Sequence, residues 1–363
     1  MSTVAVLGAG NGGLAATVEL SQAGHDVVLW NRRPATVEPY RDGIRYRGVL
    51  GEGTVRPALV TTDLAAALER AEVAVACLPG MAQAALFADL AALAARDPAG
   101  PLARLPLVLN PGHTGAALHA RRVWREHGAS LPPLCELSTL TYVARVDTDH
   151  TLGVTGRAGT VRAACLPGGQ EALDWAQRLF PGVTPVGDVL ASSLSNVNIV
   201  LHPPGAVLGL AWVEATGGDF TFYVEGMTPA VARVLVALDE ERRAVARAFG
   251  HDLPPLVEEM AAIGTVEPAD AGGDVAAAIR GGRANRAIRA PDSTTHRYYR
   301  EDLGYGLAPL VALAEIADRP VPVASALLTL GRIATGDTEP VMDRQRLGLA
   351  GVSRADLLAI VRG

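Results

Sequence analysis

The residues TVAVLGAGNGGLAATVELSQAGHDVVLW, 3–30, decide the fold of this chain. They predict a buried strand over 3–7, a helix over 12–23 that ends at Gly24, and a second strand over 26–30. Strand, helix and strand within about 30 residues form the repeating unit of a parallel sheet. Because further apolar runs follow at 73–78 and 105–109, the first half of the chain is expected to be a doubly wound α/β domain.

A glycine-rich loop, GAGNGG at 8–13, joins the first strand to the helix and matches the GxGxxG pattern of dinucleotide-binding sites. Gly8 would permit the tight turn, Gly10 would let the backbone approach a pyrophosphate, and Gly13 would let the helix pack on the strand. The N-terminus of the helix adds partial positive charge for the phosphates. We therefore predict a Rossmann-type cofactor site whose loop residues also include Asn11 and Gly12.

The end of the second strand indicates which dinucleotide binds. Sites for NAD usually carry an acidic residue there, which binds the ribose 2′-hydroxyl. This chain has Asn31, Arg32 and Arg33 instead. Two guanidinium groups beside a neutral amide suit a 2′-phosphate, because arginine binds phosphate through two parallel hydrogen bonds. The predicted cofactor is therefore NADP (NADPH) in preference to NAD.

Composition excludes several classes of function. The formal net charge of −6 gives no electrostatic basis for a nucleic-acid partner, and all 32 Lys and Arg residues are arginines, which excludes a catalytic lysine. The cysteines lack the spacing of a metal site or a disulfide framework, so no metal is predicted. With no signal-peptide pattern and no uninterrupted apolar stretch of about 20 residues, the chain is expected to be cytoplasmic and to have no membrane partner.

A length of 363 residues predicts two domains. Residues 150–166 resemble two strands around a glycine-containing turn, and the chain becomes helical after 188, so the expected domains are 1–187, Rossmann-type, and 188–363, all α. The best-defined helix spans 228–249, with Thr228 as N-cap and Gly250 after its end. Further helices are expected over 305–317, 321–335 and 353–361, and the apolar ones leave a homodimer open.

Two segments of the second half carry unusual polar residues. In NVNIVLHPP, 196–204, Asn198 and His202 would share one face of a helix, and the Pro-Pro pair is expected to stop or bend it. In HRYYREDLGYGLAP, 296–309, a charged and aromatic run precedes an apolar helix. Such a run suits an acid that orients a histidine and an arginine that binds a carboxylate.

These segments resemble the octopine/nopaline dehydrogenases, the opine dehydrogenase family, and the resemblance extends over most of the chain. It includes GAGNGG, ELSTLTYVAR at 136–145, NVNIVLHPP, FYVEGMTPAVARVLVALDEERRAVARAFG at 222–250 and HRYYREDLGYGLAP. The chain departs from the family pattern at Ala144, where a Cys is usual, and at Gly304, where Pro is frequent. Both departures bear on the substrate pocket and leave the amino donor open.

The resemblance implies an enzyme that joins the amino group of an amino acid to a 2-oxo acid and reduces the resulting imine with a nicotinamide cofactor. It implies that His202 is the catalytic histidine, Asp302 its carboxylate partner and Arg297 the residue that binds a substrate carboxylate. Asn198 matches the amide-bearing turn before the histidine. An imidazole changes charge near neutral pH, as the proton transfers of imine formation require.

Other assignments stay open. His113, in NPGHTG, and Tyr142, in TYVAR, are candidates for lining the substrate site. An imine reductase of secondary metabolism and a non-catalytic NADP-binding sensor would fit the same scaffold. Ketopantoate and β-hydroxyacid reductases share the domain order, but their chemistry uses a lysine, which this chain lacks.

Overall fold

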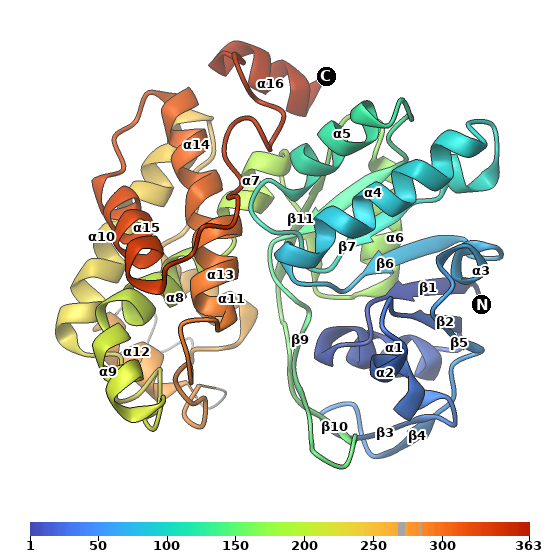
Figure 1. Cartoon of the computed structure of the whole chain (residues 1–363), viewed down its shortest axis with the longest axis horizontal. Helices are drawn as coiled ribbons and strands as arrows, with labels where there is room; N and C mark the ends of the chain where they lie inside the picture. The colour runs from blue at the N-terminus through green and yellow to red at the C-terminus, as the bar shows by residue number, and fades with distance from the viewer. Residues whose placement is uncertain (268–272, 283–284) are drawn as a thin grey trace. The chain divides into compact units, whose positions relative to one another are not determined.

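The computed structural model describes residues 1–267, 273–282 and 285–363, which form two compact units (Figure 1). Unit 1 comprises residues 1–112 and 116–189, and unit 2 comprises residues 113–115 and 190–363. The main division follows Val189, whereas the sequence analysis predicts a boundary at 187.

Unit 1 is built on an eight-stranded sheet in the order β12-β11-β8-β7-β6-β1-β2-β5. Neighbouring strands are parallel except β8 and β11, so the predicted Rossmann-type fold is confirmed. The strands are β1 Thr3–Leu7, β2 Asp26–Trp30, β5 Leu59–Thr61, β6 Val73–Ala76, β7 Leu107–Leu109, β8 Leu134–Leu137, β11 Val161–Cys165 and β12 Val183–Pro185. The helices are α1 Asn11–Gln22, α2 Pro34–Val37, α3 Leu64–Leu68, α4 Gly80–Arg96, α5 Ala116–Glu126 and α6 Gln170–Leu179, with 3₁₀ turns η1 Glu38–Tyr40 and η2 Pro101–Arg104.

A second sheet of unit 1 has the order β4-β3-β10-β9. Its strands are β3 Ile44–Gly48, β4 Gly53–Val55, β9 Tyr142–Val146 and β10 Leu152–Arg157. Both strands expected within 150–166 exist, but they do not pair with each other: β10 pairs with β9, and β11 pairs with β8 in the large sheet. Alternating apolar residues indicate that a segment is a strand, but they do not indicate its partner.

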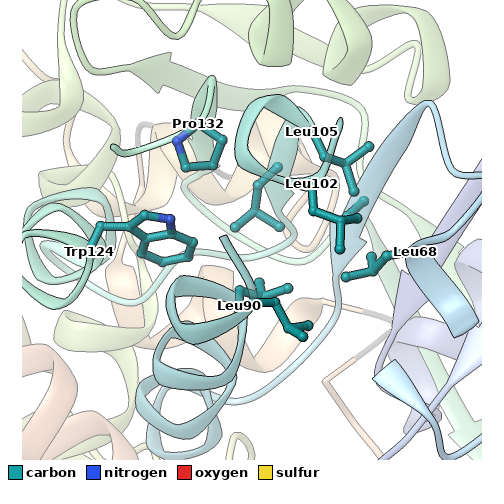
Figure 2. Close-up of a pocket in the computed structure, with 9 residues that line it drawn as sticks. Leu68, Leu90, Leu102, Leu105, Trp124 and Pro132 are labelled. Carbon is teal, nitrogen blue, oxygen red and sulfur yellow. The ribbon is translucent and has the colours of Figure 1, made fainter. Parts of the chain in front are cut away.

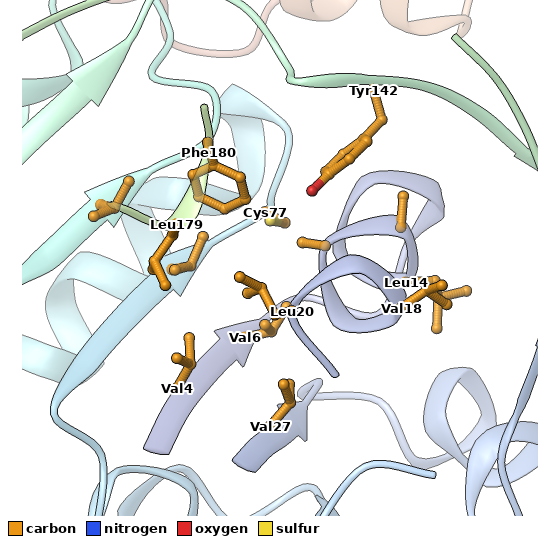
Figure 3. Packing of buried hydrophobic residues seen from close by; sticks show 14 of the residues in the cluster. Val4, Val6, Leu14, Val18, Leu20, Val27, Cys77, Tyr142, Leu179 and Phe180 are labelled. Atoms are coloured by element: carbon orange, nitrogen blue, oxygen red, sulfur yellow. The ribbon is translucent and has the colours of Figure 1, made fainter. Parts of the chain in front are cut away.

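The apolar core of unit 1 explains why the second sheet lies where it does. In Figure 3, Val4 and Val6 of β1 lie with Leu20 of α1 in one cluster. Leu152 and Val154 of β10 belong to the same cluster and are fully buried. The second sheet therefore covers α1, while α4 and α5 lie side by side elsewhere on the large sheet (Figure 1).

Backbone contacts at the junction of β1 and α1 explain two of the glycines. Gly8 has a φ of +121°, which favours glycine, and a Cβ there would lie 2.5 Å from the carbonyl oxygen of Cys77. A Cβ on Gly13 would lie 1.7 Å from the carbonyl oxygen of Gly8. The first turn of α1 therefore packs directly on the end of β1.

Unit 2 is helical, as predicted. Its helices are α7 Val189–Leu194 (which begins in unit 1), α8 Asn198–Leu208, α9 Leu210–Thr216, α10 Pro229–Ala248, α11 Leu256–Ile263, α12 Val275–Gly281, α13 Arg297–Asp302, a π-helix η4 Leu303–Leu307, α14 Ala308–Ala317, α15 Pro322–Thr335 and α16 Arg354–Arg362. Within its described residues the β pairing is limited to one bridge, between Thr221 and Arg289. The hydroxyl of Thr228 accepts a hydrogen bond from the amide of Val231, so the predicted N-cap of α10 is confirmed.

The prediction that the Pro-Pro pair stops or bends the helix is wrong. Helix α8 continues through Pro203 and Pro204 to Leu208, and the chain bends by 61° only around Gly209. Each proline removes one amide donor from the helix, yet both are buried, and tight packing of this segment holds the helical backbone. Among the described helices none alone is long and apolar enough to span a membrane; residues 189–208 and 210–216 meet those criteria only as a bent pair.

Gly13→Ala is expected to destabilise unit 1. Because the added methyl group has no room, α1 must move away from β1, which should lower the free energy of unfolding by at least about 2 kcal/mol. Gly10→Ala is the control for added volume, since a Cβ there meets nothing within 4 Å, and only the loss of a favourable N-cap residue should lower its stability, by about 1 kcal/mol or less. Denaturant titration followed by circular dichroism measures both. Equal stability of the two variants would contradict the close packing at Gly13.

Candidate active site

The glycine-rich loop of unit 1 is held by side chains that the sequence analysis assigned to the cofactor. The Asn31 Oδ1 accepts a hydrogen bond from the amide of Ala9 at 3.3 Å, and its Nδ2 donates to the carbonyl of Arg33 at 3.4 Å. The Asn11 Oδ1 accepts from the amide of Val146 at 3.0 Å. Both asparagines therefore support the loop from within unit 1.

The surface beside Gly10 fits a dinucleotide. A Cβ on Gly10 would meet no atom within 4 Å, and this residue is the N-cap of α1, where amide donors face outward. Gly12 differs, because a Cβ there would lie 2.7 Å from the side chain of Leu140. Arg32 and Arg33 are exposed, and neither forms an ion pair within the described part of the chain. Their guanidinium groups are thus available to an anion.

In unit 2 the structure brings together two residues that the sequence analysis paired. His202 lies in α8, and Asp302 is the last residue of α13. The distance from His202 Nδ1 to Asp302 Oδ2 is 2.7 Å, and both side chains are buried. Because the buried carboxylate accepts a hydrogen bond from Nδ1–H, the neutral ring carries its lone pair on Nε2. This arrangement suits general acid–base chemistry.

Two tyrosines at this histidine were missed. The hydroxyl of Tyr223 lies 2.7 Å from His202 Nε2 and 3.3 Å from the hydroxyl of Tyr298. The ring of Tyr298 stacks on the imidazole with centroids 3.9 Å apart and an angle of 22°. Burial raises the pKa of Tyr223 well above its usual value, so its hydroxyl stays protonated. One signal could have found them: aromatic residues make up only 4% of the chain, yet they recur in FYVEG and HRYYRED.

Helix α13, which carries Tyr298 and Asp302, also contributes a cation, Arg297. Arg297 forms an ion pair with Glu301, with Nη2 and Oε2 2.8 Å apart, and its side chain is about half exposed. His296 is the N-cap of α13, and its Nδ1 accepts from the amide of Tyr298. The pKa of His296 is lowered, first by burial and then by the charge of Arg297. The ring that caps α13 is therefore held neutral.

Three further candidates lie in different surroundings. Asn198 begins α8, and its backbone amide donates to Asn196 Oδ1 at 3.1 Å, so Asn196 shapes the turn before the helix. His113 is buried in unit 2, and its ring packs edge-on against that of Tyr305, with the ring centroids 5.4 Å apart. Tyr142 lies in the core of unit 1, where its hydroxyl donates to the carboxylate of Glu19.

A small pocket of unit 1 takes no part in this chemistry (Figure 2). It is lined by Leu68, Ala74, Leu90, Leu93, Leu102, Leu105, Leu107, Trp124 and Pro132. Its volume of about 20 Å³ admits one water molecule at most. The walls carry no acid, base or nucleophile, so the residues around His202 are the stronger candidate.

Comparison with known proteins agrees with this arrangement of domains. A family described as "NAD/NADP octopine/nopaline dehydrogenase, alpha-helical domain" matches residues 185–335, and one described as "NAD-dependent glycerol-3-phosphate dehydrogenase N-terminus" matches residues 3–100. The opine dehydrogenase of Arthrobacter sp. (strain 1C) is 32% identical over 99% of this chain and 98% of its own length.

Solved structures show the same fold. Octopine dehydrogenase in complex with NADH and agmatine matches with a TM-score of 0.77 at 20% identity, over 99% of this chain and 98% of that one. NADP⁺-bound yersinopine dehydrogenase matches with a TM-score of 0.70 at 16% identity, over 100% of this chain and 98% of that one.

Acid is expected to destabilise the protein in part through His113. Burial lowers the pKa of this ring from 6.5 to about 4, although a hydrogen bond to the Thr114 carbonyl opposes the shift. The unfolded chain therefore takes up this proton first as the pH falls. The free energy of unfolding should be unaffected above pH 6.5 and should decline by on the order of 3 kcal/mol as the pH falls to about 4.

His113→Asn provides the comparison, because its amide keeps a donor near Nδ1 but does not titrate. Denaturant titrations between pH 7 and 4 should show a shallower decline in this variant than in the parent chain. Parallel declines would mean that His113 is not held neutral by burial.

Proposed function

The chain belongs to the octopine/nopaline dehydrogenase family, and we propose that it is an opine dehydrogenase. It would condense the amino group of an amino acid with a 2-oxo acid and reduce the resulting imine, in a reversible reaction. The observation that carries this proposal is the buried hydrogen bond between His202 and Asp302 in the helical unit. The named activity of the Arthrobacter relative, which matches along nearly the whole chain, supports it.

Proton transfer is the part of the reaction that the histidine can perform. Loss of water from a carbinolamine requires a proton on the leaving oxygen. Asp302 fixes the tautomer of His202 and stabilises the imidazolium that forms when Nε2 takes up a proton. Because the pair is enclosed by Phe222, Tyr223 and Tyr298, bulk water is excluded from the ring.

Arg297 is proposed to bind a substrate carboxylate. Glu301 uses one nitrogen of the guanidinium, which orients the group and leaves other N–H donors for a second carboxylate. Asn198 and His113 stay in the proposed substrate set. Tyr142 does not, because its hydroxyl is bonded to Glu19 in the core of unit 1.

NADPH is the proposed cofactor, held by the loop around Gly10 and by Arg32 and Arg33. When bound, the dinucleotide supplies the hydride that reduces the imine carbon. Solved relatives carry NADH in one case and NADP⁺ in another, so the preference of this chain rests on its own two arginines. The homodimer and the cytoplasmic location stay predictions.

The decisive experiment follows the absorbance of NADPH across a grid of amino acids and 2-oxo acids, with each partner omitted in turn. Oxidation that requires both partners is expected. Oxidation with a 2-oxo acid alone would replace the proposal with a simple oxo-acid reductase. Oxidation only with preformed imines would favour an imine reductase, and binding without oxidation would favour a sensor.

His202→Ala is expected to lower kcat by about 10²–10⁴-fold, because the proton donor is lost. The Kd for NADPH should stay unchanged, since the cofactor loop lies in unit 1. His127→Ala is the matched control, because that histidine is exposed at the end of α5. Steady-state kinetics and fluorescence titration measure the two quantities. Near-normal turnover of His202→Ala would refute the assignment.

Arg297→Ala should raise the KM for the carboxylate substrate by at least about tenfold, because a charge-assisted hydrogen bond is lost. The KM of Arg297→Lys should lie between those of Arg297→Ala and the parent enzyme, since lysine keeps the charge but not the planar fork. A fall in kcat at unchanged KM would mean that Arg297 does not hold the carboxylate.

Replacing Arg32 and Arg33 by alanine should lower kcat/KM for NADPH by at least about tenfold and leave kcat/KM for NADH unchanged, because only NADPH carries the 2′-phosphate. Arg41→Ala is the control, since this nearby exposed arginine is paired with Glu38. The ratio of kcat/KM for the two cofactors measures the effect. An unaltered ratio would place the 2′-phosphate site elsewhere.

A further inference from the structure

The reactive nitrogen of His202 is not open to a substrate. With Nδ1–H donated to Asp302, the lone pair on Nε2 is the only basic position of the neutral ring. The hydroxyl of Tyr223 lies 2.7 Å from that nitrogen and donates to it. A substrate could therefore exchange a proton with this imidazole either after Tyr223 has moved away or through the Tyr223 hydroxyl.

The surroundings of Tyr223 oppose its movement. Its side chain is 3% exposed, with Phe222 packed edge-on at 5.0 Å and the Tyr298 hydroxyl at 3.3 Å. The imidazole is fixed in turn by the ring of Tyr298 stacked on it and by Asp302. A hydroxyl that donates to Nε2 keeps two acceptor lone pairs, so it can accept a proton from a substrate while it donates its own to the imidazole.

We propose that Tyr223 is a catalytic residue whose hydroxyl carries the proton between His202 Nε2 and the reacting oxygen and nitrogen of the substrate. This inference rests on the proposed opine dehydrogenase function and adds a group that neither the sequence analysis nor the family resemblance assigned. Arg297 directly precedes Tyr298 in α13, and the hydroxyl of Tyr298 lies 3.3 Å from that of Tyr223. A carboxylate bound by Arg297 would bring the adjacent oxo group of a 2-oxo acid towards Tyr223.

The proton balance closes without another reagent. The amino acid arrives as an ammonium ion and gives one proton, through the Tyr223 oxygen, to Nε2. The free amine then adds to the oxo carbon, and a second proton moves from nitrogen to oxygen to form the carbinolamine. The stored proton returns through Tyr223 to the hydroxyl group, the C–O bond breaks, water leaves, and the nitrogen lone pair forms the C=N bond. Tyr223 and His202 return to their initial protonation states.

The neutral state of Tyr223 agrees with this role. Burial raises its pKa well above the usual value, although the charge of Arg297 acts in the opposite direction. A phenol that does not ionise near neutral pH is a poor base by itself, but it can still transfer a proton in a concerted step between two partners.

Tyr223→Phe tests the proposal, and Tyr299→Phe is the matched control. Tyr299 is a buried tyrosine of α13, the helix that carries Asp302, but its hydroxyl donates to the carbonyl of Ala206 and not to His202. Tyr223→Phe is expected to lower kcat by about 10²–10³-fold, with KM for the 2-oxo acid and Kd for NADPH within about twofold of the parent enzyme. Tyr299→Phe should keep its kcat. Normal kcat in Tyr223→Phe would overturn the relay and make His202 the direct proton donor.

A second measurement does not depend on turnover. In the ¹⁵N spectrum of histidine-labelled enzyme, the Nε2 resonance of His202 should shift in Tyr223→Phe, as the hydrogen bond is lost, and should not shift in Tyr299→Phe. An unchanged resonance would show that Tyr223 does not bond to Nε2, and the relay would be wrong even if kcat fell. If the parent enzyme oxidises NADPH with no pair of substrates, the proposed function fails, whereas the spectrum still tests the contact between Tyr223 and His202.

Discussion

The hydrogen bond between His202 and Asp302 is the interaction on which the candidate site depends. Its partners are separated by 100 residues in the sequence and come from two different helices. A buried carboxylate without a partner would be strongly destabilising, so the histidine and the aspartate each make the burial of the other possible. The three aromatic rings around them then remove water from the pair, which strengthens the hydrogen bond and fixes the plane of the imidazole.

Unusual helical features flank both partners. The π-helix η4 begins directly after Asp302, and such wide turns are frequent at functional sites. Within it, a Cβ on Gly306 would lie 2.8 Å from the side chain of Ile199, so glycine allows η4 to approach α8 closely. On the other side, α8 carries its histidine directly before two prolines that a helix normally excludes. The candidate catalytic pair therefore lies beside a π-helix in one element and beside two prolines within the other.

Prediction from the sequence succeeded where the signal was local. The strand over 3–7, the helix that follows and the N-cap at Thr228 depend on residues a few positions apart, and the structure confirms them. The prediction of a helix over 305–317 is confirmed only for α14, because residues 305–307 belong to the π-helix. Apolar periodicity does not distinguish a π-helix from an α-helix. The pairing of β10 with β9 was missed, as was the bond between Tyr142 and Glu19, 123 residues apart.

The sequence by itself determined the α/β unit and its glycine-rich loop, because backbone sterics and side-chain periodicity act over short distances. It also placed His202 and Asp302 together, though only through resemblance to a family. Only the tertiary structure decided that the Tyr223 hydroxyl bonds to Nε2 of His202 and that Tyr298 stacks on the imidazole. Such contacts arise when helices pack, and which side chains then meet depends on the rotation and spacing of those helices, which no local pattern records.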